Sequence, residues 1–261
     1  MEITTNDVIY ERRGAVAWLT FNRPDSRNAM TFEMYDILGQ VCDEVENDPD
    51  VRVLVLRGAG DKAFVAGTDI SQFQSFTDPE HALDYEERVG GMITKFENLN
   101  KPTIVVIQGY AVGGGAGIAM AADLRIGTPN AKFGMPIART LGNCLAMGNY
   151  ARMVDLIGPA LTKQLIFTAE MVQAEKAEQI GLLNEIVEPE DLEERVTEIA
   201  EKIASHAPLT IQVTKESVKR VLDYRRPERD KELLLKAYMS EDFKEGVNAF
   251  LEKRKPEWKG R

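Results

Sequence analysis

One stretch of the chain decides the fold, and it reads PTIVVIQGYAVGGGAGIAMAAD from Pro102 to Asp123. Its first half is an apolar, β-branched run that predicts a buried strand, and its second half predicts an apolar helix. The glycines at 113–115 join the two. A strand that turns into a helix through glycine presents backbone N–H groups with no side chain in front of them. The stretch therefore predicts a site for an anion, or for a negative charge that forms during a reaction.

The glycine run also has other interpretations. Glycine lets a helix and a strand pack closely without any ligand. A dinucleotide-binding loop needs the spacing G-x-G-x-x-G, whereas Gly113, Gly115 and Gly117 give G-x-G-x-G, and no Gly-Lys-Ser/Thr is present for a P-loop. The run thus favours an anion site or close packing, and a nicotinamide-dependent dehydrogenase stays as an outside alternative.

Composition and charge limit the class of protein. The chain has 261 residues and a mass of 29.2 kDa, which suits one large domain, or one domain with a helical appendage. A net charge of −10 argues against nucleic acid and anionic membranes as partners. Cys42 and Cys144 suggest no disulfide framework, and His81 and His206 belong to no cluster with metal-ligand spacing. With no secretory signal or membrane span in view, we expect a cytoplasmic protein without a metal.

Periodicity predicts alternating strands and helices in the first half of the chain. A hairpin is expected over residues 8–21, followed by a helix that Thr31 caps and that ends at Asp48-Pro49. The remaining expected elements are strands at 51–56, 124–128 and 131–134, a strand from Pro102 to the glycine run, and a helical region at 71–98. From Pro159 onward the pattern is mostly helical. This order predicts a layered α/β core followed by helices.

A second glycine-bearing turn follows another apolar segment, at Ala66-Gly67-Thr68-Asp69-Ile70. Alone it is a weak motif, since Asp69 is also suited to cap the next helix. It gains weight when paired with the glycine run at 113–115, because an oxyanion hole commonly takes two backbone N–H groups from two separate loops. A third segment, from Asn22 to Met30, is either a solvated loop before a capped helix or a place where Arg23 and Arg27 meet phosphates.

These segments occur in a fixed order with several others. They are Asn22-Arg-Pro24, Asn28-Ala-Met30, Ala63-Phe64, residues 66–70, Lys101-Pro102, residues 109–115, Ala122-Asp123, Phe133-Gly134, Pro136 and residues 249–256. Together they resemble the crotonase superfamily, also called the enoyl-CoA hydratase/isomerase family. The resemblance implies an α/β ClpP/crotonase-like fold of repeated β-β-α units with two nearly perpendicular sheets. It further implies a crotonase core over residues 1–200 and a C-terminal helical region over 201–261 that mediates trimers, often paired into hexamers.

The resemblance also implies a ligand and a set of site residues. The ligand is an acyl-CoA thioester, with no cofactor beyond coenzyme A, and the backbone amides of Thr68 and Gly114 polarise its carbonyl and stabilise the enolate. The residues implied in binding coenzyme A or substrate are Arg23, Arg27, Ala66, Gly67, Asp69, Ile70 and Gly113, together with Phe250 and Lys253 from a neighbouring subunit. The basic tail around Lys253-Arg254-Lys255 suits a negatively charged coenzyme A, although it is also an ordinary solvated terminus.

The chain departs from the family where water is activated. Hydratases of this family hold and split a water with two glutamates, and the matching positions here are Gly117 and Ile137, or Ala138 if the register slips by one. Hydration is therefore not expected. Arg139 is a candidate to stabilise a carboxylate or enolate, and Asn143 to orient a water. Glu86 and Glu87 lie on the expected helix before Met92, in a region that the resemblance implies lines the acyl pocket. They are lower-ranked candidates, because charged residues on such a helix are usually solvated.

The reaction stays open between several classes. Decarboxylation demands least of a general base, because loss of CO₂ itself creates the enolate, and hydrolysis or isomerisation are further variants. A relative that binds acyl-CoA without turning it over is a non-enzymatic alternative. RNA binding, known for some proteins of this fold, is disfavoured by the net charge of −10.

Overall fold

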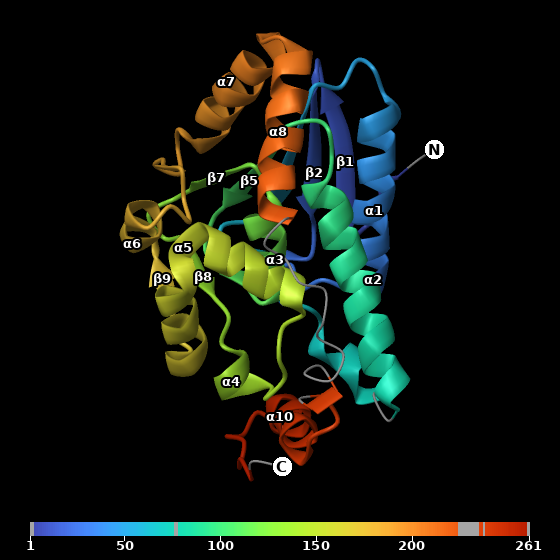
Figure 1. The fold of residues 1–261 in the computed structure, drawn as a ribbon, viewed down its shortest axis with the longest axis vertical. Coiled ribbons are helices and arrows are strands. Elements are labelled where there is room, and N and C mark those ends of the chain that lie inside the picture. Colours follow the sequence, from blue (N-terminus) through green and yellow to red (C-terminus); the bar gives the residue numbers. More distant parts are fainter. Residues whose placement is uncertain (1–2, 76–77, 224–234, 237, 260–261) are drawn as a thin grey trace.

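The structure is a computed structural model that describes residues 3–75, 78–223, 235–236 and 238–259 (Figure 1). Its strands are β1 (Val8–Arg13), β2 (Val16–Phe21), β3 (Val53–Gly58), β4 (Ala63–Val65), β5 (Thr103–Ile107), β6 (Tyr110–Val112), β7 (Leu124–Gly127), β8 (Lys132–Gly134), β9 (Val172–Gln173) and β10 (Glu185–Ile186). Its helices are η1 (Pro24–Ser26), α1 (Phe32–Asn47), η2 (Ile70–Ser75), α2 (Pro79–Glu97), α3 (Gly114–Ala121), α4 (Ile137–Thr140), α5 (Met147–Thr168), α6 (Ala174–Gln179), α7 (Leu192–Ser205), α8 (Pro208–Asp223) and α10 (Glu241–Leu251).

The strands form two sheets that repeat one unit. The larger sheet has the order β1-β2-β3-β5-β7-β10 and the smaller one β4-β6-β8-β9. In β3-β4-α2, β5-β6-α3 and β7-β8-α4, the first strand joins the larger sheet, the second joins the smaller sheet, and a helix follows. Successive units pair in parallel in both sheets. The predicted α/β fold of repeated β-β-α units is thereby confirmed.

The stretch that leads to the glycine run forms two strands rather than the single one predicted from sequence. It breaks at Gln108-Gly109, where β5 leaves the larger sheet and β6 enters the smaller one. Gly109 has φ +67, and a Cβ there would overlap the backbone carbonyl of Lys62. The apolar pattern continues through the corner because both strands are buried, so only the glycine marks the break.

Both faces of the larger sheet are covered, which explains its continuous apolar strands. Along β2, Trp18 packs in a cluster with Val196 and Ala200 of α7, whereas Leu19 and Phe21 belong to the main core with residues of α1. The helix α7 extends to Ser205, so a boundary at residue 200 falls inside a helix that covers the sheet. Locally, Thr31 caps α1 as predicted, with its Oγ1 accepting from the N–H of Met34 (3.2 Å).

The C-terminal helices lie at two ends of the molecule. Figure 1 shows α7 and α8 at one end and α10 at the other, below α4. Phe243 of α10 packs edge-on against Phe73 of η2 (6.0 Å between ring centroids) and against Tyr238 (4.8 Å). Gly246 lets α10 approach α4, because a Cβ at this position would overlap the carbonyl of Leu141. The last described helix therefore packs on its own chain, beside the pocket described next.

Candidate active site

The first wall of the pocket is the loop from Ala66 to Asp69, which lies beside Met30. The N–H of Met30 donates to the carbonyl of Gly67 (2.8 Å), and the N–H of Asp69 donates to the carbonyl of Met30 (2.8 Å), so Met30 and Thr68 form a parallel bridge. In such a bridge the middle residue of the bonded loop turns its own N–H and C=O the other way. The Thr68 amide therefore faces away from Met30, and Thr68 lines an open cavity of about 470 Å³.

The second wall is the start of α3. Gly113 adopts φ +55 and ψ −119, and Gly114 begins the helix, where backbone amides have no carbonyl four residues back. The two walls approach closely, since a Cβ built on Gly113 would lie 3.6 Å from the Cα of Gly67, and one built on Gly114 would lie 3.2 Å from Oγ1 of Thr68. Two amides from separate loops thus border one cavity, which suits two donors on one carbonyl oxygen.

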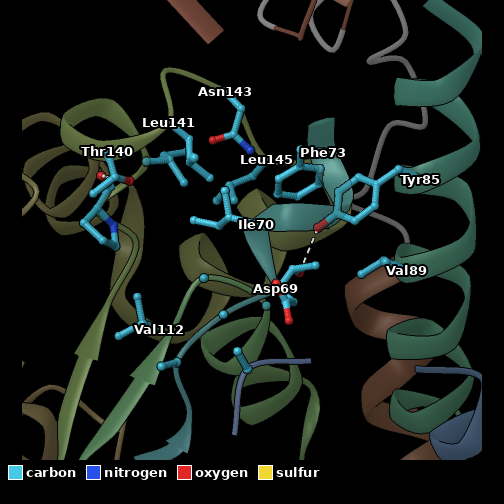
Figure 2. Close-up of a pocket in the computed structure, with 18 of the residues that line it drawn as sticks. Asp69, Ile70, Phe73, Tyr85, Val89, Val112, Thr140, Leu141, Asn143 and Leu145 are labelled. Atoms are coloured by element: carbon cyan, nitrogen blue, oxygen red, sulfur yellow. Dashed lines mark hydrogen bonds between the residues drawn. The ribbon is translucent and has the colours of Figure 1, made fainter. Parts of the chain in front are cut away.

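A chain of hydroxyl groups holds the Thr68 side chain. Its Oγ1 lies 3.0 Å from Oη of Tyr35 and 3.0 Å from Oη of Tyr85, which comes from α2. Figure 2 shows Tyr85 beside Phe73, with the dashed hydrogen bond running from the tyrosine hydroxyl. Burial raises the pKa of both tyrosines above the ordinary range, so both stay protonated. The hydroxyl chain fixes the loop that carries the Thr68 amide.

Asp69 is tied to Arg23. The two guanidinium nitrogens of Arg23 each lie 3.3 Å from Oδ2 of Asp69, and Arg23 also reaches Asp7 and the carbonyl of Ala29. Partial burial raises the pKa of Asp69, but hydrogen bonds from Ser71 and the charge of Arg23 outweigh it and lower the pKa overall. Asp69 is thus an ionised cap at η2, and Arg23 braces the loop without lining the cavity.

Arg27 lines the cavity, and its guanidinium carbon lies 5.7 Å from the ring centroid of Tyr110. Nζ of Lys132, which does not line the cavity, lies 5.3 Å from the same centroid. The carbonyl of Arg27 accepts from the N–H of Ala66 (3.1 Å), so this residue is joined to the first wall. Two cations beside one aromatic ring suit the phosphates of a nucleotide-like ligand.

The nearest side chains to a Cβ built on Gly117 are not acidic. A Cβ built on Gly117 would lie 3.2 Å from Oδ1 of Asn149 and 3.3 Å from Cδ1 of Ile93, so these two side chains take the place of a longer one. Oδ1 of Asn149 accepts from Nη1 of Arg152 (3.1 Å), which leaves the Nδ2 group as the donor end of this amide. Ile137 is buried and also lines the cavity.

Arg152 is buried and paired. Only 4% of its side chain is exposed, and its Nη2 lies 2.7 Å from Oε2 of Glu97 and 3.2 Å from Oγ1 of Thr94. The ion pair links α5 to α2. Arg152 therefore sets the orientation of the Asn149 amide.

The structure gathers most of the predicted site residues, but not all. Those that line the cavity are Arg27, Ala66, Gly67, Thr68, Asp69, Ile70, Gly113, Gly114, Asn143 and Phe250. Arg139 is exposed on α4 and Lys253 is exposed after α10, and neither lines the cavity. Figure 2 shows Asn143 above Leu141 and Leu145. Its Nδ2 donates to Oη of Tyr238 (3.2 Å), while its buried Oδ1 has no hydrogen-bond partner within the described residues.

Phe250 lines the cavity of its own chain. The reason is the packing of α10 on η2 and α4, which brings the end of the helix to the pocket. The resemblance implied that a neighbouring subunit supplies this residue to the coenzyme A site, and that contact stays a prediction for the oligomer.

Other residues of the site had no sequence signal. Tyr35, Tyr85, Asn149 and Tyr238 come from distant parts of the chain. The first three look like ordinary helix residues of α1, α2 and α5, and Tyr238 precedes α10. Neither His81 nor His206 lines the cavity, so no imidazole stands beside Cys144 there. Within the described ranges no three metal-ligating side chains cluster. Among the helices described, none has the length and apolar character to cross a membrane.

Comparison with known proteins places the chain in a family. A family model described as enoyl-CoA hydratase/isomerase matches residues 11–261. The short-chain-enoyl-CoA hydratase of Clostridium acetobutylicum is 38% identical over 255 residues, covering 97% of each chain. The (E)-benzylidenesuccinyl-CoA hydratase of Thauera aromatica is 38% identical over 258 residues, covering 97% of this chain and 99% of that protein.

Solved structures agree. A methylmalonyl-CoA decarboxylase in complex with 2-nitronate-propionyl-CoA superposes with a TM-score of 0.90 at 31% identity, covering 99% of this chain and 100% of the other. The fold and the two glycine-bearing loops are those of enzymes that act on acyl-CoA, and these matches agree. The chain belongs to the enoyl-CoA hydratase/isomerase family of the crotonase superfamily.

Proposed function

We propose that this protein is an enzyme that binds an acyl-CoA thioester and stabilises the enolate of the acyl group with the backbone amides of Thr68 and Gly114. The observation that carries the proposal is the Met30–Thr68 bridge, which turns the Thr68 amide away from Met30 next to the start of α3. Amides held this way need no reorganisation when negative charge develops. Arg27, a cation that lines the cavity, supports a place for the phosphates of coenzyme A.

We propose further that the reaction is not hydration by a pair of carboxylates. The support is chemical: Gly117 has no side chain, Ile93 and Asn149 occupy the adjoining space, and Ile137 is apolar. General acid–base groups each contribute about 10²–10⁴-fold to a rate.

The first prediction follows from this. The kcat/KM for hydration of crotonyl-CoA is expected to be at least about 100-fold below that of the Clostridium acetobutylicum relative, assayed side by side. A panel of enoyl-, malonyl-type and β-ketoacyl-CoA thioesters then identifies the reaction. Hydration at the rate of the relative would show that other groups replace the two glutamates.

Decarboxylation of a malonyl-type thioester is the second candidate. It needs no base to form the enolate, and the likeness to a methylmalonyl-CoA decarboxylase favours it. Against it, Arg27 is the one cation among the described residues that line the cavity. If Arg27 binds the phosphates of coenzyme A, an acyl carboxylate has no second cation among those residues. Release of CO₂ from a malonyl-type thioester would support decarboxylation. The absence of CO₂ release would exclude this candidate.

We also propose a homo-oligomer, a trimer or a pair of trimers. The support is α8, on which Leu209, Val213, Val218 and Val221 are each more than half exposed. Sedimentation of the pure protein is expected to give a mass of three or six chains of 29.2 kDa. A monomer at micromolar concentration would refute the proposal.

A further inference from the structure

One acidic side chain enters the cavity from α2. Tyr85, Glu86, Val89 and Ile93 of this helix line the cavity, whereas Glu87 is exposed and does not. Charged residues on a helix normally keep to the solvent side. Glu86 instead stands in a cavity whose other lining residues are mainly apolar or aromatic.

Glu86 accepts a hydrogen bond from Tyr238, which lies outside α2. The hydroxyl of Tyr238 donates to Oε1 of Glu86 and accepts from Nδ2 of Asn143 (3.2 Å). Tyr238 is almost completely buried, and burial together with the charge of Glu86 raises the pKa of its hydroxyl, so it stays a donor. A solvated surface glutamate has no such support. The carboxylate is therefore positioned, in the way that proton-transfer groups are.

The carboxylate and the paired amides open into the same cavity. Tyr85, the neighbour of Glu86, hydrogen-bonds through its hydroxyl to Oγ1 of Thr68 (3.0 Å), directly at the amide loop. The pKa of Tyr35, whose hydroxyl lies against Gly114, is raised by burial and also by the charge of Glu86. The field of this carboxylate thus reaches the place where an enolate would form.

We propose that Glu86 is the proton-transfer group of this site, an inference that rests on the proposed function. The C–H bond next to the thioester carbonyl breaks, its electron pair becomes the enolate held by the amides of Thr68 and Gly114, and the proton moves to the Glu86 carboxylate. The proton returns to the same carbon or, from a dienolate, to the γ-carbon, which shifts the double bond.

The same geometry selects the acyl group. A second carboxylate on the acyl chain would share the cavity with Glu86. Arg27 is the one cation among the described lining residues, and the proposed function assigns it to the phosphates of coenzyme A. Like charges in a cavity of low polarity repel strongly. The substrate class is therefore an uncharged, largely apolar acyl group.

The test uses butyryl-CoA in D₂O. The wild-type protein is expected to incorporate deuterium at the carbon next to the thioester carbonyl, measured by mass spectrometry. Glu86→Gln is expected to slow this exchange at least about 100-fold while binding butyryl-CoA, measured by calorimetry, as the wild type does. Glu87→Gln is the matched control on the same helix and should exchange at the wild-type rate. Glu86→Asp, which keeps the carboxylate, should fall between.

The outcomes separate the two proposals. A wild type that binds no acyl-CoA overturns the proposed function. A wild type that binds butyryl-CoA but exchanges no proton, or a Glu86→Gln variant that exchanges at the wild-type rate, overturns the role of Glu86 and leaves the binding function standing. If Glu86→Gln fails to fold, Glu86→Asp and Tyr238→Phe carry the test, since both should slow exchange without weakening binding.

Discussion

Gly114→Ala is expected to lower kcat/KM on the thioester substrate about 100- to 1,000-fold, the loss typical of one missing oxyanion donor. The added Cβ would overlap the hydroxyl of Tyr35, which is fully buried and hydrogen-bonded to Thr68. Because Tyr35 is fully buried, we expect the start of α3 to shift, which moves the Gly114 amide from its place beside the Thr68 amide. Steady-state kinetics measures the effect.

Two variants make this result specific. Gly91→Ala adds the same methyl to α2, where nothing lies within 4 Å, so activity should be unchanged and the helix slightly stabilised. Tyr35→Phe removes the obstructing hydroxyl, after which the nearest atoms to the new Cβ are Oγ1 of Thr68 at 3.2 Å and Cζ of residue 35 at 3.5 Å. The double variant should therefore recover to within about tenfold of Tyr35→Phe alone. Full activity in Gly114→Ala alone would remove this amide from the proposed mechanism.

The sequence predicted the elements that need particular residues in the backbone. Where α3 starts, a Cβ on Gly115 would overlap the carbonyl of Val65. Because the backbone there requires glycine, the glycine run at 113–115 marks the start of the helix in the sequence. Thr31 is likewise readable, because a hydroxyl before an apolar helix is a common cap. These features are local, and local chemistry is what a single sequence carries.

The sequence could not predict features that depend on distant contacts. Tyr85 and Tyr238 are 153 positions apart, yet their ring centroids lie 6.2 Å apart at the pocket. Asn149 reaches the place left by Gly117 only because Arg152 orients it, and nothing in the sequence around 149 marks that role. The position of α10 over its own pocket depends on how tightly Gly246 meets α4. Such contacts follow from packing and not from any single motif.

The second large effect concerns stability. Glu97→Ala is expected to lower the free energy of unfolding by about 3–5 kcal/mol, measured by urea titration, because it leaves the guanidinium of Arg152 buried without its carboxylate. The Nε atom of Arg152 already lacks a hydrogen-bond partner among the described residues. No second carboxylate among them is therefore in place to pair with the Arg152 guanidinium once Glu97 is removed. The control is Lys95→Ala, also on α2, which breaks an exposed ion pair with Asp43 of α1. This variant should lower the free energy of unfolding by less than about 1 kcal/mol.

The double variant Glu97→Met/Arg152→Met separates stability from function. Removing both charges together should restore at least about 2 kcal/mol relative to Glu97→Ala, since apolar side chains of similar volume replace a buried ion pair at little cost. The Asn149 amide, however, loses the Nη1 donor that orients it. The double variant should therefore fold stably and still bind acyl-CoA more weakly than the wild type. If a stable double variant binds acyl-CoA with the affinity of the wild type, Arg152 stabilises the packing of α5 on α2 but does not orient the Asn149 amide.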